Sequence, residues 1–229
     1  MSSVAIITAR GGSKRIPHKN IKDFCGKPII AYSIEAALAA GCFDEVMVST
    51  DDPKIAEIAE QYGAKVPFMR SAENADDFST TRDVVKEVLS QYAGLGDVFE
   101  YACCIYPTAP FITGQRLQEA MELLQTKEAD SVIPVVQFSF PPQRGFVVKD
   151  GLTEFKWPEN ALARSQDLEP MYHDCGQFYC LNTASFAEQE MMVMKKTYSV
   201  ILNELEVQDI DNETDWKLAE LKFRLLREM

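Results

Sequence analysis

The 229-residue sequence has no segment typical of secreted or membrane-spanning proteins. It shows no basic start followed by an apolar signal core, and none of its apolar runs approaches the roughly 18 residues that a membrane span needs. The six cysteines form no CxxC pair and no zinc-type spacing, and each lies in or beside an apolar stretch. These features predict a cytoplasmic protein with reduced, mostly buried thiols and no contact with a membrane.

Positive charge is also scarce. The chain has 23 Lys and Arg residues against 35 Asp and Glu residues, which gives a net charge of −12. This balance disfavours a broad binding surface for nucleic acid or for an anionic membrane. We therefore expect any anionic ligand to be held by basic groups that are gathered locally.

Apolar β-branched runs alternate with helix-period stretches along most of the chain. The expected strands are residues 4–8, 46–50, 101–106, 131–136, 177–181 and 198–202. The expected helices are residues 28–40, 53–62 and 114–125, a helix opened by a capping box of Thr80 and Asp83, and a helix after residue 212. This alternation predicts an α/β fold with a Rossmann-like, doubly wound, mostly parallel sheet in a single domain, 1–229.

The alternation is interrupted between residues 138 and 180. This stretch contains prolines, aromatic residues and a Lys149-Asp150-Gly151 turn signal, so we expect an inserted β-rich arm built on a hairpin. Exposed aromatic residues need a partner surface, and a second copy of the chain is the commonest partner. The arm therefore predicts a homodimer.

The segment ARGGSKRIPHKN, residues 9–20, directly follows the first expected strand. It carries five basic side chains, which are those of Arg10, Lys14, Arg15, His18 and Lys19. Gly11 and Gly12 would let the backbone turn sharply and bring its N–H groups close to a ligand. The segment fits neither GxGxxG nor GxxxxGK[ST], and a solvated basic turn is the alternative. We interpret it as a polyphosphate-binding loop at the carboxyl edge of the sheet.

Two acidic residues precede the last expected helix. Asp209 and Asp211 are separated by one residue, so on an extended stretch their side chains project to the same side. Such a pair can share a Mg²⁺ ion, which prefers oxygen ligands. Helix N-capping by Asp211 or Asn212 is the alternative that the residues leave open.

The loop ARGGSKRIPHKN resembles the amino-terminal signature of the sugar-nucleotide cytidylyltransferases that activate nonulosonic (sialic-type) acids. Further similarity lies in VMVSTDDPKIAEIAEQYGAKV, PFMRSAE, YPTAP and DIDNETDW, so the resemblance covers nearly the whole chain. It implies a fold of the nucleotide-diphospho-sugar transferase type. It also implies that CTP and a sugar acid react to give a CMP-sugar and pyrophosphate, with Mg²⁺ required.

The resemblance also implies roles for particular residues. The expected CTP-binding residues are Arg10, Gly12, Ser13, Lys14, Lys19, Asn20, Arg70 and Thr80. Among them Asn20 and Arg70 would contact the cytidine portion. The expected metal ligands are Asp209 and Asp211, and the expected catalytic residues are Arg10, Lys19 and Asp211.

The sugar acid is indicated by a second group of residues. Tyr106 stands where the N-acetylneuraminate enzymes typically carry Gln, and an aromatic ring there suits a sugar with deoxy and acylamino positions. The segments FPPQRG and DCGQFY resemble the branch that activates pseudaminic acid. The expected sugar contacts are Tyr106, Gln143, Arg144, Gln177 and Tyr179, with Arg144 gripping the carboxylate in a two-pronged bond.

Alternatives exist at three levels. The enzyme could instead be specific for N-acetylneuraminic or legionaminic acid, or the chain could be a non-catalytic nucleotide-binding protein. The joint presence of Arg10, Lys19, Asp209 and Asp211 favours an enzyme. His173 is a candidate proton acceptor for the sugar hydroxyl, and an ordinary hydrogen-bonded histidine is the alternative.

Overall fold

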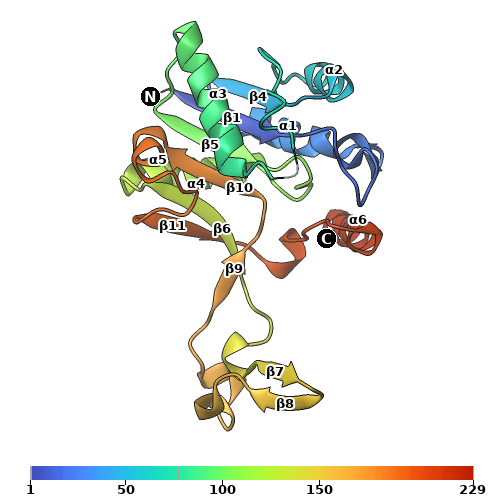
Figure 1. The fold of residues 1–229 in the computed structure, drawn as a ribbon, viewed down its shortest axis with the longest axis vertical. Helices are drawn as coiled ribbons and strands as arrows, with labels where there is room; N and C mark the ends of the chain where they lie inside the picture. The colour runs from blue at the N-terminus through green and yellow to red at the C-terminus, as the bar shows by residue number, and fades with distance from the viewer. Residues whose placement is uncertain (1, 77, 229) are drawn as a thin grey trace.

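The computed structural model describes residues 2–76 and 78–228. Within these residues a seven-stranded sheet forms the centre of the molecule (Figure 1). Its strands are β1 (Ser3–Thr8), β4 (Glu45–Ser49), β5 (Tyr101–Ile105), β6 (Ser131–Gln137), β9 (Tyr172–Asp174), β10 (Phe178–Asn182) and β11 (Thr197–Ile201). The order is β11-β6-β10-β5-β1-β4, with β9 paired to β6.

The sheet is mostly parallel, as predicted. β4, β1 and β5 run parallel to one another, and β11 runs parallel to β6. β10 lies between β5 and β6 and is antiparallel to both, because the chain returns from the arm in the opposite direction. The sequence pattern predicted a strand at residues 177–181 but not its reversed direction.

Helices cover both faces of the sheet (Figure 1). On one face lie α1 (Ile29–Ala40), α2 (Pro53–Gln61) and α4 (Gly114–Thr126), and on the other lie α3 (Thr81–Leu95) and α5 (Thr183–Gln189). Side chains alternate along β1, so Ala5 and Ile7 pack with the first group while Val4 and Ile6 pack with the second. Burial on both faces makes the strands almost wholly apolar and confirms the doubly wound fold.

Local sequence signals explain the helix ends. Pro53 is the first residue of α2, and Thr80 and Asp83 form the predicted capping box of α3. Gly41 and Gly63 end helices with φ of 63° and 93°, a region that glycine adopts without strain. Pro28 was expected as the first helical residue, but it pairs with Asp23 in the hairpin of β2 (Asp23–Phe24) and β3 (Lys27–Pro28), so α1 begins at Ile29.

The inserted arm extends away from the sheet (Figure 1). Its hairpin consists of β7 (Phe146–Lys149) and β8 (Leu152–Phe155), and Asp150 and Gly151 form the predicted turn with φ of 50° and 81°. Short 3-10 turns flank the hairpin, namely η2 (Pro142–Arg144), η3 (Pro158–Asn160) and η4 (Ser165–Asp167). The end of the expected 138–180 range already belongs to the sheet, since β9 and the start of β10 pair there.

A separate aromatic cluster fixes the carboxyl-terminal helix α6 (Glu213–Glu228). The ring of Phe24 lies edge-on to those of Trp216 and Phe223, with centroids 5.5 and 5.4 Å apart. Ile16 and Ile210 are fully buried in the same cluster. These contacts hold the segment before α6 against the loop that follows β1, which includes the 3-10 turn η1 (Lys19–Ile21).

All six cysteines are free, and four of them are buried, which confirms the expected thiols. None of the helices formed by residues 2–76 and 78–228 combines the length and the apolar character that a membrane span requires.

Candidate active site

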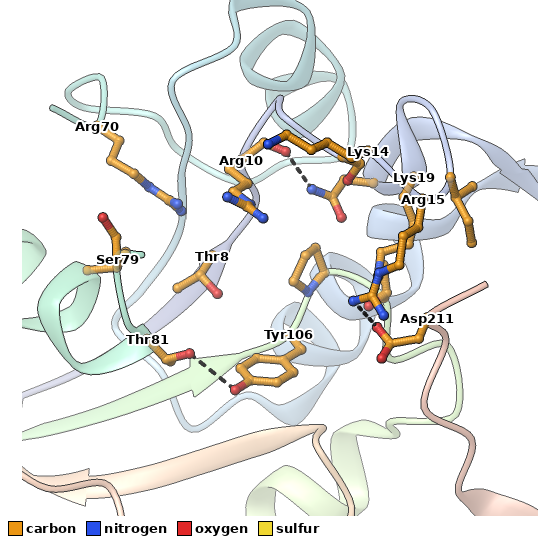
Figure 2. Close-up of a pocket in the computed structure, with 16 residues that line it drawn as sticks. Thr8, Arg10, Lys14, Arg15, Lys19, Arg70, Ser79, Thr81, Tyr106 and Asp211 are labelled. Atoms are coloured by element: carbon orange, nitrogen blue, oxygen red, sulfur yellow. Dashed lines mark hydrogen bonds and ion pairs between the residues drawn. The ribbon is translucent and has the colours of Figure 1, made fainter. Parts of the chain in front are cut away.

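A cavity of about 260 Å³ opens where β1 and β5 end (Figure 2). The two strands are parallel neighbours, so Thr8 at the end of β1 and Tyr106 just after β5 reach the same edge of the sheet. The cations that line the cavity are Arg10, Lys14, Arg15, Lys19 and Arg70, and Asp211 is the carboxylate. The remaining lining residues are Ser13, Ile16, Asn20, Ser79, Thr81, Val84, Pro107 and Thr108. The structure thus gathers the predicted basic loop and one predicted aspartate around one space.

The two glycines of the basic loop have different environments. A Cβ on Gly11 would lie 2.9 Å from Cβ of Asp52, whereas a Cβ on Gly12 would meet nothing within 4 Å. Neither glycine has the positive φ that would make a left-handed turn. The N–H of Gly11 donates to Oδ1 of Asp51 at 2.9 Å. Glycine is therefore required at position 11 by the close approach of Asp52, and Gly12 lies outside the residues that line the cavity.

Arg10 and Asn20 are connected through the backbone of the loop. Nδ2 of Asn20 donates to the carbonyl oxygen of Arg10 at 2.8 Å, and Asn20 is buried. Nη1 of Arg10 donates to the carbonyl oxygen of Asp76 at 2.7 Å. The buried amide of Asn20 therefore fixes the course of the loop. Asn20 also lines the cavity, and it is one of the two residues that we expected to contact the cytidine portion of CTP.

Lys19 connects the basic loop to the acidic segment. Its Nζ donates to the carbonyl oxygen of Ile210 at 2.7 Å. Burial lowers the pKa of Lys19, and the carboxylates of Asp211 and Asp209 oppose this shift. The ammonium therefore lies within the field of both predicted metal ligands.

Arg70 forms the opposite wall of the cavity (Figure 2). The side chain is buried and held at the end of β4, where its Nε donates to Oγ of Ser49 at 3.0 Å and its Nη2 donates to the carbonyl oxygen of Ser49 at 2.6 Å. Burial lowers the pKa of this guanidinium. Arg70 thus presents a fixed, partly desolvated cation to the cavity.

The cap of α6 is made by residues other than Asp211. Oδ1 of Asn212 accepts from the N–H groups of Thr214 and Asp215 at 2.8 and 3.1 Å, and Oδ2 of Asp215 accepts from the N–H of Asp211 at 3.0 Å. The carboxylate of Asp211 lies in the cavity, where its Oδ1 accepts from Nη2 of Arg15 at 2.7 Å (Figure 2). The capping alternative therefore applies to Asn212.

Asp209 lines a second cavity of about 620 Å³ and not the smaller one that Asp211 lines, so the two aspartates, expected to project to the same side, line different cavities. Burial raises the pKa of Asp209, and the negative charge of Asp211 raises it further. Among the described residues no cluster of three or more His, Cys, Asp or Glu side chains could hold a metal by itself. A cation at this pair would need further oxygen ligands from water or from a bound phosphate.

Tyr106 separates the two cavities and lines both. Its hydroxyl lies 3.1 Å from Oγ1 of Thr81, and its ring centroid lies 5.7 Å from that of Tyr179. The hydroxyl of Tyr179 donates to Oδ2 of Asp174 at 2.6 Å. Tyr106 and Tyr179, both expected at the sugar, therefore share a wall of the larger cavity.

Lys222 is a cation of the larger cavity that the sequence did not indicate. Its Nζ donates to the carbonyl oxygens of Val207 and Glu204 at 2.8 and 3.2 Å. In the sequence, only its place next to Phe223, a residue of the buried face of α6, hinted that Lys222 could lie near a cavity. Only the packing of residues 204–209 against the helix brings the ammonium to the cavity.

His173 also lines the larger cavity. Its Nδ1 lies 2.9 Å from the carbonyl oxygen of Asp174, and its ring centroid lies 4.7 Å from that of Phe138, with the two rings tilted by 53°. A carbonyl oxygen can only accept, so Nδ1 is the donor in this contact. A role as proton acceptor stays a prediction.

Thr80 and Gln177 lie outside both cavities. The hydroxyl of Thr80 donates to Oδ2 of Asp83 at 2.6 Å in the capping box of α3. Gln177 is buried, and its Nε2 donates to the carbonyl oxygen of Glu206 at 2.7 Å, within η5 (Glu204–Glu206). Ser79 and Thr81, the neighbours of Thr80, do line the smaller cavity, and the sequence reasoning missed both.

Gln143 and Arg144 lie in η2 of the arm, and the arm extends away from strands β5 and β10, which lead to Tyr106 and carry Tyr179 (Figure 1). Arg144 lines a cavity of about 400 Å³ within the arm, and its Nη1 donates to Oγ of Ser165 at 3.3 Å. Oε1 of Gln143 and Nε of Arg144 are buried and have no hydrogen-bond partner within the described residues. One chain therefore does not bring these two expected sugar contacts to the larger cavity.

Comparison with known proteins places these features in context. The family model described as Cytidylyltransferase matches residues 4–195. The whole chain is 37% identical over 229 residues to a pseudaminic acid cytidylyltransferase of Campylobacter jejuni, and the match covers 99% of that protein. It is 34% identical over 242 aligned positions to a CMP-N,N′-diacetyllegionaminic acid synthase of Legionella pneumophila, with 100% of this chain and 99% of that protein covered.

A solved structure shows the same fold. CMP:2-keto-3-deoxy-manno-octonic acid synthetase in complex with CTP superimposes with a TM-score of 0.69 at 19% identity, and the match covers 100% of both chains.

Proposed function

Because this chain belongs to the cytidylyltransferase family, we propose that it transfers CMP from CTP to the anomeric hydroxyl of pseudaminic acid and releases pyrophosphate. One observation supports this reaction above all others. The basic loop after β1 and the Asp209–Asp211 segment before α6 meet between a cationic cavity and a second, larger cavity. The first suits a nucleoside triphosphate, and the second suits a sugar acid.

The smaller cavity would hold CTP. Guanidinium groups grip phosphate oxygens in two places, and ammonium groups act as point charges, so the loop offers both kinds of cation to the triphosphate. Those cations are Arg10, Lys14 and Lys19, and the loop also supplies the N–H of Gly12 and the side chain of Ser13. Asn20 and the fixed guanidinium of Arg70 would contact the cytidine portion.

Asp209 and Asp211 would hold Mg²⁺. Two neighbouring carboxylates beside the proposed triphosphate site fit this ion, because Mg²⁺ commonly keeps several waters and takes one or two carboxylates plus substrate phosphates. The part of the chain that the structure describes offers no cluster of three or more His, Cys, Asp or Glu side chains here, so waters and phosphate oxygens would complete the coordination. When bound, the ion would neutralise charge on the phosphate oxygens. Lys19, which is hydrogen bonded to the backbone between the two aspartates, would contribute a second positive charge at the same place.

The chain's own residues would act mainly by positioning. Displacement at the α-phosphorus requires the sugar hydroxyl to be aligned with the leaving pyrophosphate and the developing charge to be stabilised. Tyr106 lies between the cavities and would set the boundary between nucleotide and sugar. Arg10 and Lys19 would stabilise negative charge on the phosphates.

The larger cavity would select the sugar acid. The rings of Tyr106 and Tyr179 form an aromatic wall, which suits a sugar with deoxy and acylamino positions in place of hydroxyls. Lys222 supplies a cation for the sugar carboxylate.

We further propose that the arm joins two copies of the chain. The apolar side chains Phe140, Phe146, Val148, Leu152 and Leu162 are exposed on it. Exposed apolar side chains gathered on one arm need a partner surface, and a second copy of the chain would cover them. The same contact would bring Gln143 and Arg144 of one copy to the larger cavity of the other copy. Both residues could then contact the sugar, as the sequence suggested, although they lie far from that cavity in their own chain.

Pyrophosphate release measures this function directly. Purified protein should convert CTP in the presence of Mg²⁺ and pseudaminic acid, with a lower kcat/KM for N-acetylneuraminic and legionaminic acids. A preference for either of those acids would overturn the substrate assignment. Binding of CTP without turnover of any of the three acids would favour a non-catalytic nucleotide-binding protein.

A further inference from the structure

Arg15 forms an ion pair across the mouth of the smaller cavity. Its Nη2 lies 2.7 Å from Oδ1 of Asp211, and the two residues are 196 positions apart in the chain. Both side chains remain partly in solvent, with relative exposures of 69% and 45%. Arg15 lines the same wall as Lys14 and Lys19 (Figure 2).

The ion pair occupies the carboxylate that is proposed to bind Mg²⁺. A guanidinium and a divalent cation repel each other, and both would use the oxygens of Asp211. The Arg15 guanidinium must therefore weaken the binding of a metal ion to Asp211, and a bound metal ion must weaken the ion pair. Arg15 is the cation that pairs with the Asp211 carboxylate, whereas Lys19 donates to the backbone oxygen of Ile210.

Asp211 does not need Arg15 to stay in place. Its N–H is held by Oδ2 of Asp215 at 3.0 Å, the carbonyl oxygen before it accepts from Lys19, and the side chain of Ile210 is buried. The segment is therefore fixed on both sides of the carboxylate. Arg15 is therefore not needed to hold the Asp211 carboxylate in position.

We propose that Arg15 is an exchangeable counter-ion that neutralises Asp211 and transfers to the triphosphate when CTP and Mg²⁺ bind. This inference depends on the proposed function, since it assigns the triphosphate to this cavity and the metal to Asp211. Exposed ion pairs contribute little net stability, so breaking this one costs little. A guanidinium matches phosphate oxygens in a two-pronged bond, and the long side chain lies on the wall that would face them.

The exchange predicts opposite effects of one substitution on two ligands. In Arg15→Ala the competing cation is gone, so Mn²⁺ alone, followed by electron paramagnetic resonance of the free ion, should bind about threefold or more tightly. The same variant loses a contact with the triphosphate, so CTP without metal, measured by calorimetry, should bind about tenfold more weakly. Arg15→Lys should restore part of the CTP affinity.

Two controls make the test specific. Arg224→Ala removes an exposed arginine that pairs with Glu220 on α6, outside the residues that line either cavity, and should change neither affinity. In an Asp211→Asn background, Arg15→Ala should no longer change Mn²⁺ binding. Weaker or unchanged Mn²⁺ binding by Arg15→Ala, or unchanged CTP binding, would overturn the exchange. Failure of the transferase reaction itself would appear separately, as absent pyrophosphate release by the unaltered protein.

Discussion

Nζ of Lys19 donates a hydrogen bond to the carbonyl oxygen of Ile210 across 2.7 Å. This bond ties the loop after the first strand to the backbone between Asp209 and Asp211, although the two partners lie 191 positions apart. A cation and two carboxylates therefore meet at one place. Substitutions of these residues should therefore affect nucleotide binding and metal binding together.

Replacement of Lys19 should impair catalysis far more than folding. Lys19→Ala removes a partly buried cation from the proposed triphosphate site, so kcat/KM for CTP should fall by about 100-fold or more, as when an enzyme loses one preorganised charge-stabilising donor. Steady-state pyrophosphate release measures the effect.

Lys22→Ala is the matched control for Lys19. Lys22 also links the loop to α6, through Glu213 at 2.8 Å, but it does not line the cavity. If Lys22→Ala reduced kcat/KM as strongly as Lys19→Ala does, Lys19 would act only as a tether.

Asp211 should be required for metal-dependent turnover but not for folding. Asp211→Ala removes a proposed ligand of Mg²⁺, whereas the cap of α6 is made by Asn212 and Asp215. We expect loss of Mg²⁺-stimulated pyrophosphate release with little change in Tm. Asn212→Ala should do the reverse, with retained turnover and a loss of about 1 kcal/mol of stability, a typical cost for a lost helix cap. Unchanged turnover in Asp211→Ala would refute the metal role.

Tyr106 should influence the choice of sugar acid. Tyr106→Gln removes the ring that packs against Tyr179 and introduces a polar amide at the boundary of the two cavities. We expect kcat/KM for pseudaminic acid to fall by about tenfold or more relative to that for N-acetylneuraminic acid, because the site would lose apolar contact area. Thr81→Val serves as the control, since it removes the hydroxyl beside Tyr106 and keeps the ring. An unchanged ratio of the two kcat/KM values would remove Tyr106 from specificity.

Thr80 should matter for stability in a pH-dependent way. Its hydroxyl, and then Arg82, lower the pKa of Asp83 from 3.8 to about 2. A lowered carboxyl pKa stabilises the folded state above the ordinary value of that pKa, and the contribution is lost as pH falls through the folded value. Thr80→Ala should therefore lower Tm near pH 7, and the difference should shrink between about pH 4 and pH 2. A raised KM for CTP in this variant would instead assign Thr80 to the nucleotide, as its sequence position suggested.

The arm should control the oligomeric state. Leu162 is 99% exposed in this chain, and Leu162→Glu should place a charge in the proposed contact between two copies. We expect light scattering to give a dimeric mass for the unaltered protein and a monomeric mass for the variant, with CTP binding retained. Leu221→Glu, at an apolar position 62% exposed on α6, should leave the dimer intact. A monomeric mass for the unaltered protein would contradict the proposal.

The sequence predicted those parts of the fold that local signals determine. The alternation of apolar runs predicted most of the strands, and Pro53, Gly41 and the Thr80–Asp83 pair marked helix ends because each acts through its own backbone or a neighbour three residues away. Helix α5 was not predicted, and neither was the reversed direction of strand β10. The direction of β10 depends on how the chain returns from the arm, which no local pattern encodes.

The same distinction applies to the site. The basic loop and the Asp209–Asp211 pair are each contiguous, so their composition and the family resemblance were enough to find them. Lys222 and the Tyr106–Tyr179 wall come together only through packing of distant segments. Arg144 shows where local reasoning stops, since its residue type suits a carboxylate but the arm carries it away from the larger cavity of its own chain.

The most direct test of the transferase is a single incubation of the purified protein with CTP, Mg²⁺ and pseudaminic acid, followed by ³¹P NMR. We predict that the CTP signals are replaced by those of pyrophosphate and of a CMP-sugar phosphodiester in equal amounts, and that Asp211→Ala leaves CTP intact. Persistence of CTP with the unaltered protein, with pseudaminic, legionaminic and N-acetylneuraminic acids alike, would contradict the proposed reaction.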